Sequence, residues 1–155
     1  MDMEIDLVTA VHLAGLALNA EALRRVHAAG HPEIRVSHGF VVQHVVEGPR
    51  PIGEIAERMG VTQQAASKAV AELQRLGYLE RTPDPRDARV RLVRLSARGT
   101  AVVEDTRRIR AEMEEDLADV LGAGRAAALR SAAQAALDWA GGGEAVRARR
   151  VRAPS

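Results

Sequence analysis

Residues 51–95 read PIGEIAERMGVTQQAASKAVAELQRLGYLERTPDPRDARVRLVRL, and this stretch decides the fold of the chain. Two sets of apolar residues repeat there at helical spacing, with Gly60 between them. The first set is Ile52, Ile55, Ala56 and Met59, and the second is Ala66, Ala69, Val70, Leu73 and Leu76. The hydroxyl of Thr62 can accept a free backbone N–H, which suits the N-cap of the second helix. The pattern predicts two short helices joined by a tight turn.

The second predicted helix, residues 63–76, carries a polar face beside its apolar stripe. Glutamine can bond adenine through two hydrogen bonds, serine can contact either strand, and a small alanine such as Ala65 can meet a thymine methyl group. The free N–H groups at the start of the helix can hold a phosphate. We therefore expect this helix to lie in a DNA major groove. The predicted contacts on it are Thr62, Gln63, Gln64, Ser67 and Lys68.

An arginine-rich hairpin is predicted after this helix. Gly77 ends the helix, residues 78–82 are extended, PDPRD is a turn signal, and residues 90–95 alternate between apolar residues and arginine. The arginines of this region are Arg81, Arg86, Arg89, Arg91 and Arg94. A helix-turn-helix followed by such a hairpin is a winged helix. The alternative, a solvated hairpin on an unrelated helical domain, is disfavoured because helix, turn and hairpin occur in the expected order.

Residues 53–99 resemble the MarR family of bacterial transcription regulators. The resemblance rests on DPRDAR at residues 84–89 and on the following V-x-L-x-R-L-S-x-x-G, which are similar to that family's wing and its exit into the next helix. It implies a mainly α (α+β) fold, with a winged helix-turn-helix lobe between terminal helices that form a dimer. It also implies that Arg89 enters the minor groove, that Asp87 braces the wing, and that Arg86 belongs to the same DNA-binding tip.

Composition restricts the possible functions. The chain has 155 residues with 46% hydrophobic content, which fits one domain with a substantial core. The net charge is only +1, which excludes a uniformly basic protein. The arginines gather in the wing and the acids in the helices, and this distribution indicates a localised DNA-binding face. The chain has no cysteine, which excludes disulfides and thiol-based redox sensing. The apolar run at residues 7–18 is too short to span a membrane and follows acids, so we expect a cytoplasmic protein.

Residues 5–29 are predicted to form a long helix that is apolar on more than one side, as burial against a second subunit would require. His27 and His31 are four residues apart, a spacing that can hold a metal on a helix. Gly30 and Pro32 break the helix between and after them, so solvated histidines at a helix end are favoured over a metal site. No glycine-rich phosphate loop and no acid pair beside a histidine is present, so neither an enzyme nor a cofactor is expected.

A second short helix is predicted over residues 36–46, with Ser37 as its N-cap. In the resembled family, a cleft between the dimerisation helices and the DNA-binding lobe takes small, often aromatic ligands. We expect His38, Phe40 and His44 to lie near such a cleft. A core histidine bonded to a backbone carbonyl is an equally supported interpretation of His38.

After the wing, Ser96 is the predicted N-cap of a long helix that runs to residue 121, and a last helix covers residues 123–140. The seam of the long helix consists of Val102, Ile109, Met113, Leu117 and Val120. We assign residues 1–48 and 97–140 to a dimerisation region and residues 49–96 to the DNA-binding lobe. Residues 141–155 are expected to form a flexible basic tail, which we interpret as solvated rather than as DNA-binding.

These observations favour a sequence-specific transcription regulator. Two recognition helices in one homodimer would enter successive major grooves about one helical turn apart, which requires a near-palindromic operator of double-stranded DNA. Repression relieved by a small aromatic ligand is what the family resemblance implies. The alternative is a winged-helix module that binds proteins without binding DNA. That alternative needs an acidic or apolar groove-facing side, and the predicted side is polar and basic.

Overall fold

The computed structural model describes residues 5–147 and shows a mainly helical chain with one small antiparallel sheet. The elements in chain order are α1 (Leu7–Ala28), α2 (Val36–Val42), β1 (Arg50–Pro51), α3 (Ile52–Met59), α4 (Gln63–Arg75), β2 (Leu79–Pro83), β3 (Arg91–Leu95), α5 (Ala97–Leu121), α6 (Ala123–Trp139) and α7 (Gly142–Arg147). The predicted class, a winged helix-turn-helix between terminal helices, is confirmed.

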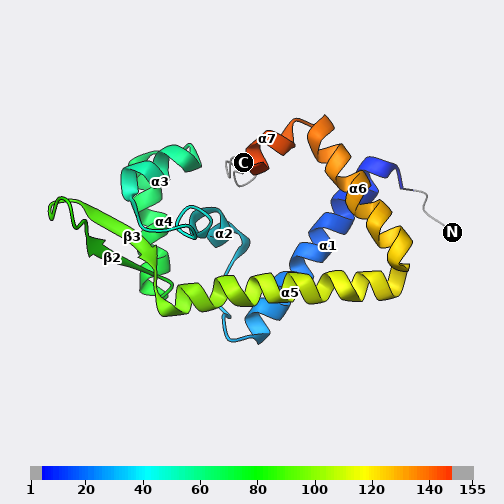
Figure 1. Cartoon of the computed structure of the whole chain (residues 1–155), viewed down its shortest axis with the longest axis horizontal. Helices are drawn as coiled ribbons and strands as arrows, with labels where there is room; N and C mark the ends of the chain where they lie inside the picture. The colour runs from blue at the N-terminus through cyan, green and yellow to red at the C-terminus, as the bar shows by residue number, and fades with distance from the viewer. Residues whose placement is uncertain (1–4, 148–155) are drawn as a thin grey trace.

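The long helix α5 connects the two ends of the molecule (Figure 1). At one end lie α3, α4 and the hairpin of β2 and β3, and at the other end lies α6. Helix α1 crosses α5 and packs against it, while α2 contacts α3 and α4. The hairpin projects away from the helices, so its tip is the outermost part of that end.

Side chains at the helix starts explain where the main helices begin. The hydroxyl of Thr62 accepts the N–H of Ala65 at 3.1 Å, and that of Ser96 accepts the N–H of Gly99 at 3.0 Å. Each bond satisfies a backbone donor that has no partner within its helix. Both predicted N-caps are confirmed. The N-cap of α1 is Asp6, which accepts the N–H of Thr9, so that helix begins two residues later than expected.

The start of α2 differs from the prediction. Its N-cap is Arg35 rather than Ser37, because the ring of His38 accepts the Arg35 N–H at 3.2 Å and thereby fixes the preceding turn. The helix is also shorter than residues 36–46: it ends at Val42, and turns follow it. A short-range histidine bond therefore takes the place of the expected serine cap.

The sheet has the order β1-β3-β2, and all pairs are antiparallel. Strand β1 was not predicted, because it contains only two residues and one of them is a proline. It pairs through Arg50 with Val93 and occupies an edge, where a strand tolerates proline. The hairpin register places Leu79 opposite Leu95 and Arg81 opposite Val93.

The core lies where the lobe meets α5. Tyr78, Ile55, Leu73, Val70 and Val93 are among its most deeply buried side chains. The first turn of α5 lies directly on the backbone of Tyr78, and a Cβ at Gly99 would be only 2.0 Å from the Tyr78 carbonyl oxygen. Gly99 is therefore required for this close approach between helix and strand.

The first residues of the segment that was expected to be a flexible tail form a helix instead. Gly142–Arg147 forms the short helix α7, which contacts α6. The arginines expected in the rest of that tail, at positions 149, 150 and 152, lie outside the described residues. No helix in the described part of the chain combines the length and the apolar character needed to cross a membrane.

Candidate nucleic-acid interface

The N-terminal half of α4 presents the polar residues that the sequence singled out. Ala66, Val70 and Leu73 are buried and hold one side of this helix against the core. On the opposite side Gln63, Gln64 and Lys68 are exposed, Ser67 is half-buried, and Thr62 is exposed at the N-cap. The structure thus brings all five predicted residues of the recognition helix onto one accessible surface.

The start of α4 is suited to an anion. Thr62 satisfies the N–H of Ala65, and the carbonyl of Thr62 accepts the N–H of Ala66. The first two N–H groups of the helix precede the first intrahelical bond and point out of its end. No acidic residue lies in the first turn, so the partial positive charge of the helix N-terminus is not neutralised locally. A phosphate group fits this environment.

The hairpin tip is braced by two aspartates. Asp84 accepts the backbone N–H of Arg86 at 2.8 Å, and Asp87 accepts that of Arg89 at 3.0 Å. Asp87 also contacts the Arg89 guanidinium at 3.3 Å. The side chains of Arg86 and Arg89 are 90% and 93% exposed. The tip therefore holds two accessible arginines on a backbone that is fixed by local carboxylates.

A buried hydrogen-bonded group joins the end of the recognition helix to α5. Tyr78, three residues after α4, is fully buried, and its hydroxyl lies 3.3 Å from Nδ1 of His31. Nε2 of His31 lies 3.1 Å from the carboxylate of Asp105 on α5. Hydrogen bonds from Arg108 and then from His31 lower the pKa of Asp105, and burial raises the pKa of Tyr78. The prediction of a solvated His31 is wrong, since this residue is only 5% exposed.

Arg98 strengthens the same junction from the α5 side. Its guanidinium lies 4.4 Å from the centroid of the Tyr78 ring and donates to the carbonyl of Leu76 at 2.7 Å. A second nitrogen contacts Glu33 at 3.3 Å. These contacts attach the C-terminal end of the recognition helix to α5. The sequence analysis did not predict that Tyr78 and Arg98 join α4 to α5. The only indication in the sequence was that both residues lie next to the hairpin.

The expected ligand residues separate into two environments. A cavity of about 380 Å³ lies between α2 and α5, and His38 is part of its lining together with Val102, Thr106, Arg107 and Arg110. Phe40, which is half-buried, and His44, which is buried, are not part of this lining. The structure therefore places only His38 at the cleft.

His38 also contacts the recognition helix. Its Nε2 lies 3.2 Å from the Arg35 guanidinium and 3.7 Å from Glu72 of α4, and Arg35 itself pairs with Glu72. These partners replace the backbone carbonyl considered from the sequence. Burial, followed by the charge of Arg35, lowers the pKa of His38. The junction of α2, α4 and the cleft therefore disfavours the charged form of the ring.

The two histidines considered for metal binding have other partners. His27 lies 2.7 Å from the carbonyl oxygen of Ile34, and His31 belongs to the group around Tyr78. Among the described residues, no group of three His, Cys, Asp or Glu side chains is placed to hold a metal ion.

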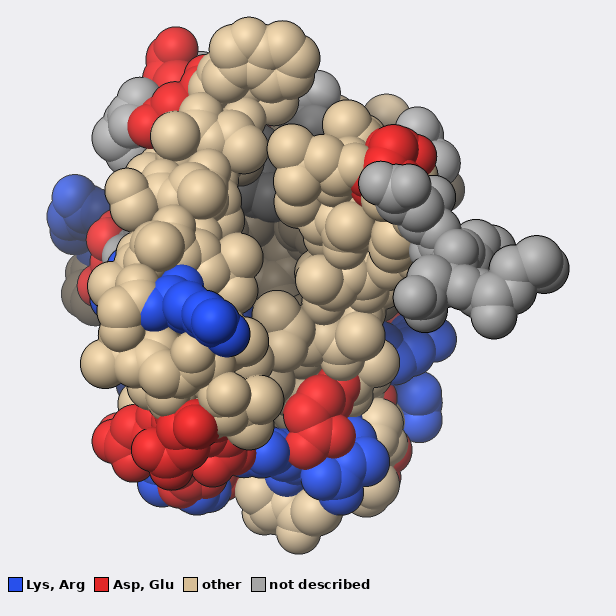
Figure 2. Space-filling view, turned by 90° about the vertical axis from the view of Figure 1, so that its right-hand side faces the viewer, with Lys and Arg blue, Asp and Glu red and all other residues tan. Residues whose placement is uncertain are grey.

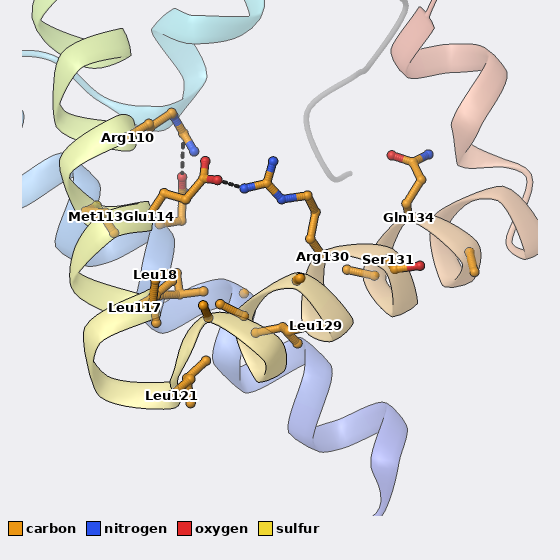
Figure 3. Close-up of a pocket in the computed structure, with 18 of the residues that line it drawn as sticks. Leu18, Arg110, Met113, Glu114, Leu117, Leu121, Leu129, Arg130, Ser131 and Gln134 are labelled. Carbon is orange, nitrogen blue, oxygen red and sulfur yellow. Dashed lines mark hydrogen bonds and ion pairs between the residues drawn. The ribbon is translucent and has the colours of Figure 1, made fainter.

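The end of the molecule opposite the wing has a large hollow. Its volume is about 1110 Å³, and α1, α5 and α6 line it. Figure 2 looks toward this end and shows a hollow surrounded mainly by side chains that are neither basic nor acidic. Figure 3 shows Leu18, Leu117 and Leu129, one from each of these helices, around the same space. An ion pair between Glu114 and Arg130 lies at its rim.

Exposed apolar residues continue from this hollow along the helices. Leu7 and Val8 at the start of α1 are 78% and 79% exposed, Val120 near the end of α5 is 82% exposed, and Trp139 at the end of α6 is 90% exposed. No residue of α6 is buried. Contiguous exposed apolar surfaces of this kind mark interaction sites.

A capped recognition helix, a braced wing and a three-stranded sheet define a winged helix-turn-helix protein. A model of the MarR family matches residues 36–90, which contain α2, both helices of the helix-turn-helix and most of the hairpin. Over these residues the chain is similar to the MarR family. None of the curated proteins compared with this chain matches it.

Solved structures share the fold over most of the chain. RV1404 from Mycobacterium tuberculosis is 20% identical, with a TM-score of 0.74 over 89% of this chain and 97% of that chain. A mutant of Staphylococcus aureus MepR bound to an oligodeoxyribonucleotide is 19% identical, with a TM-score of 0.64 over 87% and 98% of the two chains. Streptococcus pneumoniae FabT in complex with DNA is 18% identical, with a TM-score of 0.63 over 84% and 94%. At these identities the likeness concerns the fold alone.

Proposed function

We propose that this chain is a homodimeric repressor that binds a near-palindromic DNA operator through α4 and the wing. The observation that carries the proposal is the accessible face of α4, where Gln63, Gln64 and Lys68 lie beside a helix N-terminus that has no acid in its first turn. The two glutamines offer paired donor and acceptor groups to adenine, and Lys68 offers a charge to phosphate. The MepR and FabT structures described with DNA support the proposal by analogy of fold.

The dimer is proposed from the apolar surfaces of α1, α5 and α6. The hollow between these helices and the exposure of Leu7, Val120 and Trp139 leave apolar surface uncovered, and such surfaces mark interaction sites. A second copy would cover the same surfaces on both subunits, as a two-fold interface requires. Residues 1–48 and 97–140 then form the dimerisation region, and residues 49–96 form the DNA-binding lobe. This arrangement presents two copies of α4 to one duplex.

Ligand release is proposed through the cleft between α2 and α5. Arg107 and Arg110 supply positive charge to its lining, and Val102 supplies an apolar surface, so an aromatic carboxylate fits its chemistry. His38 connects the cleft to Glu72 on α4. A ligand that binds one spacing of the two lobes more tightly than the other would lower the affinity for the operator.

Genomic footprinting of the purified protein tests the DNA-binding proposal, and the DNA that flanks its own gene should be included. We expect protected sites with two half-sites related by a two-fold axis, centred about one helical turn apart. Calorimetry with a panel of aromatic carboxylates, with and without a protected site, tests the ligand. Protein that protects no sequence in the footprint would favour a winged-helix module for protein binding and contradict the proposal.

A further inference from the structure

The two faces of the wing differ in charge. Residues opposite each other in an antiparallel pair share a face, and successive residues alternate between faces. Arg81 is opposite Val93, and Arg91 lies two residues before Val93, so both arginines share the face of that buried valine. We call this the inner face, because Val93 packs into the core of the lobe. Glu80 and Arg94, which are opposite each other, lie on the outer face.

The outer face is electrically neutral at its centre. Two nitrogens of Arg94 lie 2.6 Å from the same carboxylate oxygen of Glu80. A guanidinium that already has a carboxylate partner must lose that partner, or share it, before it can bind a phosphate. The net gain from such an exchange is small, because one charged contact replaces another.

The two arginines on the inner face differ from Arg94 in that they have no carboxylate partner among the described residues. Arg81 and Arg91 are exposed, and neither forms an ion pair with any acid in the described part of the chain. They are diagonal neighbours across the hairpin, since Pro83 is opposite Arg91 and lies two residues after Arg81. The hairpin extends beyond α3 and α4 (Figure 1). Because Val93 packs into the core, the register places this pair on the face of the wing that continues from the core side of the sheet. The unpaired cations of the wing therefore gather on the side of the recognition helix.

We propose that Arg81 and Arg91 form a phosphate clamp that grips the DNA backbone from the inner face of the wing, independently of sequence. The inference rests on the proposed DNA binding and adds a site to it. The clamp differs in role from the tip: the guanidinium of Arg89 is restrained by Asp87 and reaches outward, whereas the clamp offers two cations without carboxylate partners. A cation without a partner releases a full counterion from DNA when it binds a phosphate.

The experiment measures fluorescence anisotropy on a labelled duplex of unrelated sequence, at several salt concentrations. Each lost phosphate contact lowers the slope of log affinity against log salt by about 0.9, so Arg81→Gln with Arg91→Gln should lower it by about 1.8 per wing. Two control pairs separate charge from packing. Arg81→Lys with Arg91→Lys keeps both charges and should keep most of the slope. Glu80→Gln with Arg94→Gln removes the neutral outer pair and should leave the slope unchanged.

The outcomes distinguish this clamp from the proposed function itself. All variants should keep the parent's circular dichroism and Tm, because the four side chains are not buried. A parent that binds DNA while the glutamine pair retains the parent slope would overturn the clamp and leave the proposed function intact. An equal decrease of the salt slope in the Arg81→Gln, Arg91→Gln variant and in the Glu80→Gln, Arg94→Gln control would also overturn the clamp. The effect would then not depend on which face of the wing is changed. A parent that binds no duplex at low salt overturns both proposals.

Discussion

Replacing Gly99 by alanine perturbs the junction that attaches the recognition helix to α5. The added methyl group would be 2.0 Å from the Tyr78 carbonyl oxygen and 3.1 Å from a methyl carbon of Leu95. The near atom of the first contact belongs to the backbone, which cannot rotate away, so α5 and the Tyr78 segment must separate. Overpacking of this kind costs about 1–3 kcal/mol, whereas alanine in a helix gains up to about 1 kcal/mol over glycine.

Separation would also weaken two bonds that close the junction. The Ser96 N–H donates to the Tyr78 carbonyl at 3.1 Å, and Arg98 donates to the Leu76 carbonyl. Each bond contributes about 0.5–1.5 kcal/mol. Adding the partial loss of these bonds to the cost of overpacking, and subtracting the helical gain of alanine, gives a net loss of about 2 kcal/mol for Gly99→Ala. At about 2–4 °C per kcal/mol for a chain of this size, Tm should fall by about 4–8 °C.

Thermal denaturation followed by circular dichroism measures this effect. Gly53, in the first turn of α3, is the matched control, because a Cβ there would have no heavy atom within 4 Å. Gly53→Ala should leave Tm unchanged or raise it slightly. A Gly99→Ala protein with a Tm equal to or above that of the parent would refute the close packing of α5 on Tyr78.

Three further predictions concern the tip, the assembly and pH. Arg89→Ala should weaken operator binding by about 1–3 kcal/mol per half-site and leave Tm unchanged. Lys68→Ala should instead weaken binding to all duplexes equally. Fluorescence anisotropy on operator and scrambled DNA measures both effects. Sedimentation at micromolar concentration should give a dimer, and a well-folded monomer there would exclude the proposed interface. The pKa of His38 is lower in the folded protein than its ordinary value of 6.5, so the unfolded chain takes up the proton first. Stability should therefore fall as pH decreases below about 6.5, and urea titrations should show a smaller fall for His38→Gln.

Local signals in the sequence predicted the helix-turn-helix and the wing. Thr62 and Ser96 cap their helices through residues only three positions away, and Asp87 contacts Arg89 two positions away. Such interactions depend on short spacing, which the sequence shows directly. The apolar stripe of α4 was predicted for the same reason, since helical periodicity repeats within a few residues.

The histidines could not be placed from the sequence, because distant residues decide their environment. His31 meets Tyr78 and Asp105, which are 47 and 74 positions away. His38 meets Glu72 on a separate helix. The short strand β1 was missed because its identity depends on pairing with β3, some forty positions later, rather than on a propensity of its own two residues.

The division of the wing arginines also required the structure. The sequence shows five arginines without indicating which have carboxylate partners. Only the register of the hairpin places Arg94 opposite Glu80 and Arg81 opposite Val93. A shift of the register by one residue would exchange the two faces, so the charge distribution of the wing cannot be deduced from composition.

We infer that the exposed face of α4 reads DNA sequence. The most direct measurement is the affinity of the parent and of a Gln63→Ala, Gln64→Ala variant for a footprinted site and for scrambled DNA at one salt concentration. The parent should bind its site at least about 1000-fold more tightly than scrambled DNA. The variant should lose about 1–3 kcal/mol on the site for each lost paired contact and bind scrambled DNA as the parent does. A variant that discriminates between the two duplexes as well as the parent would contradict the claim.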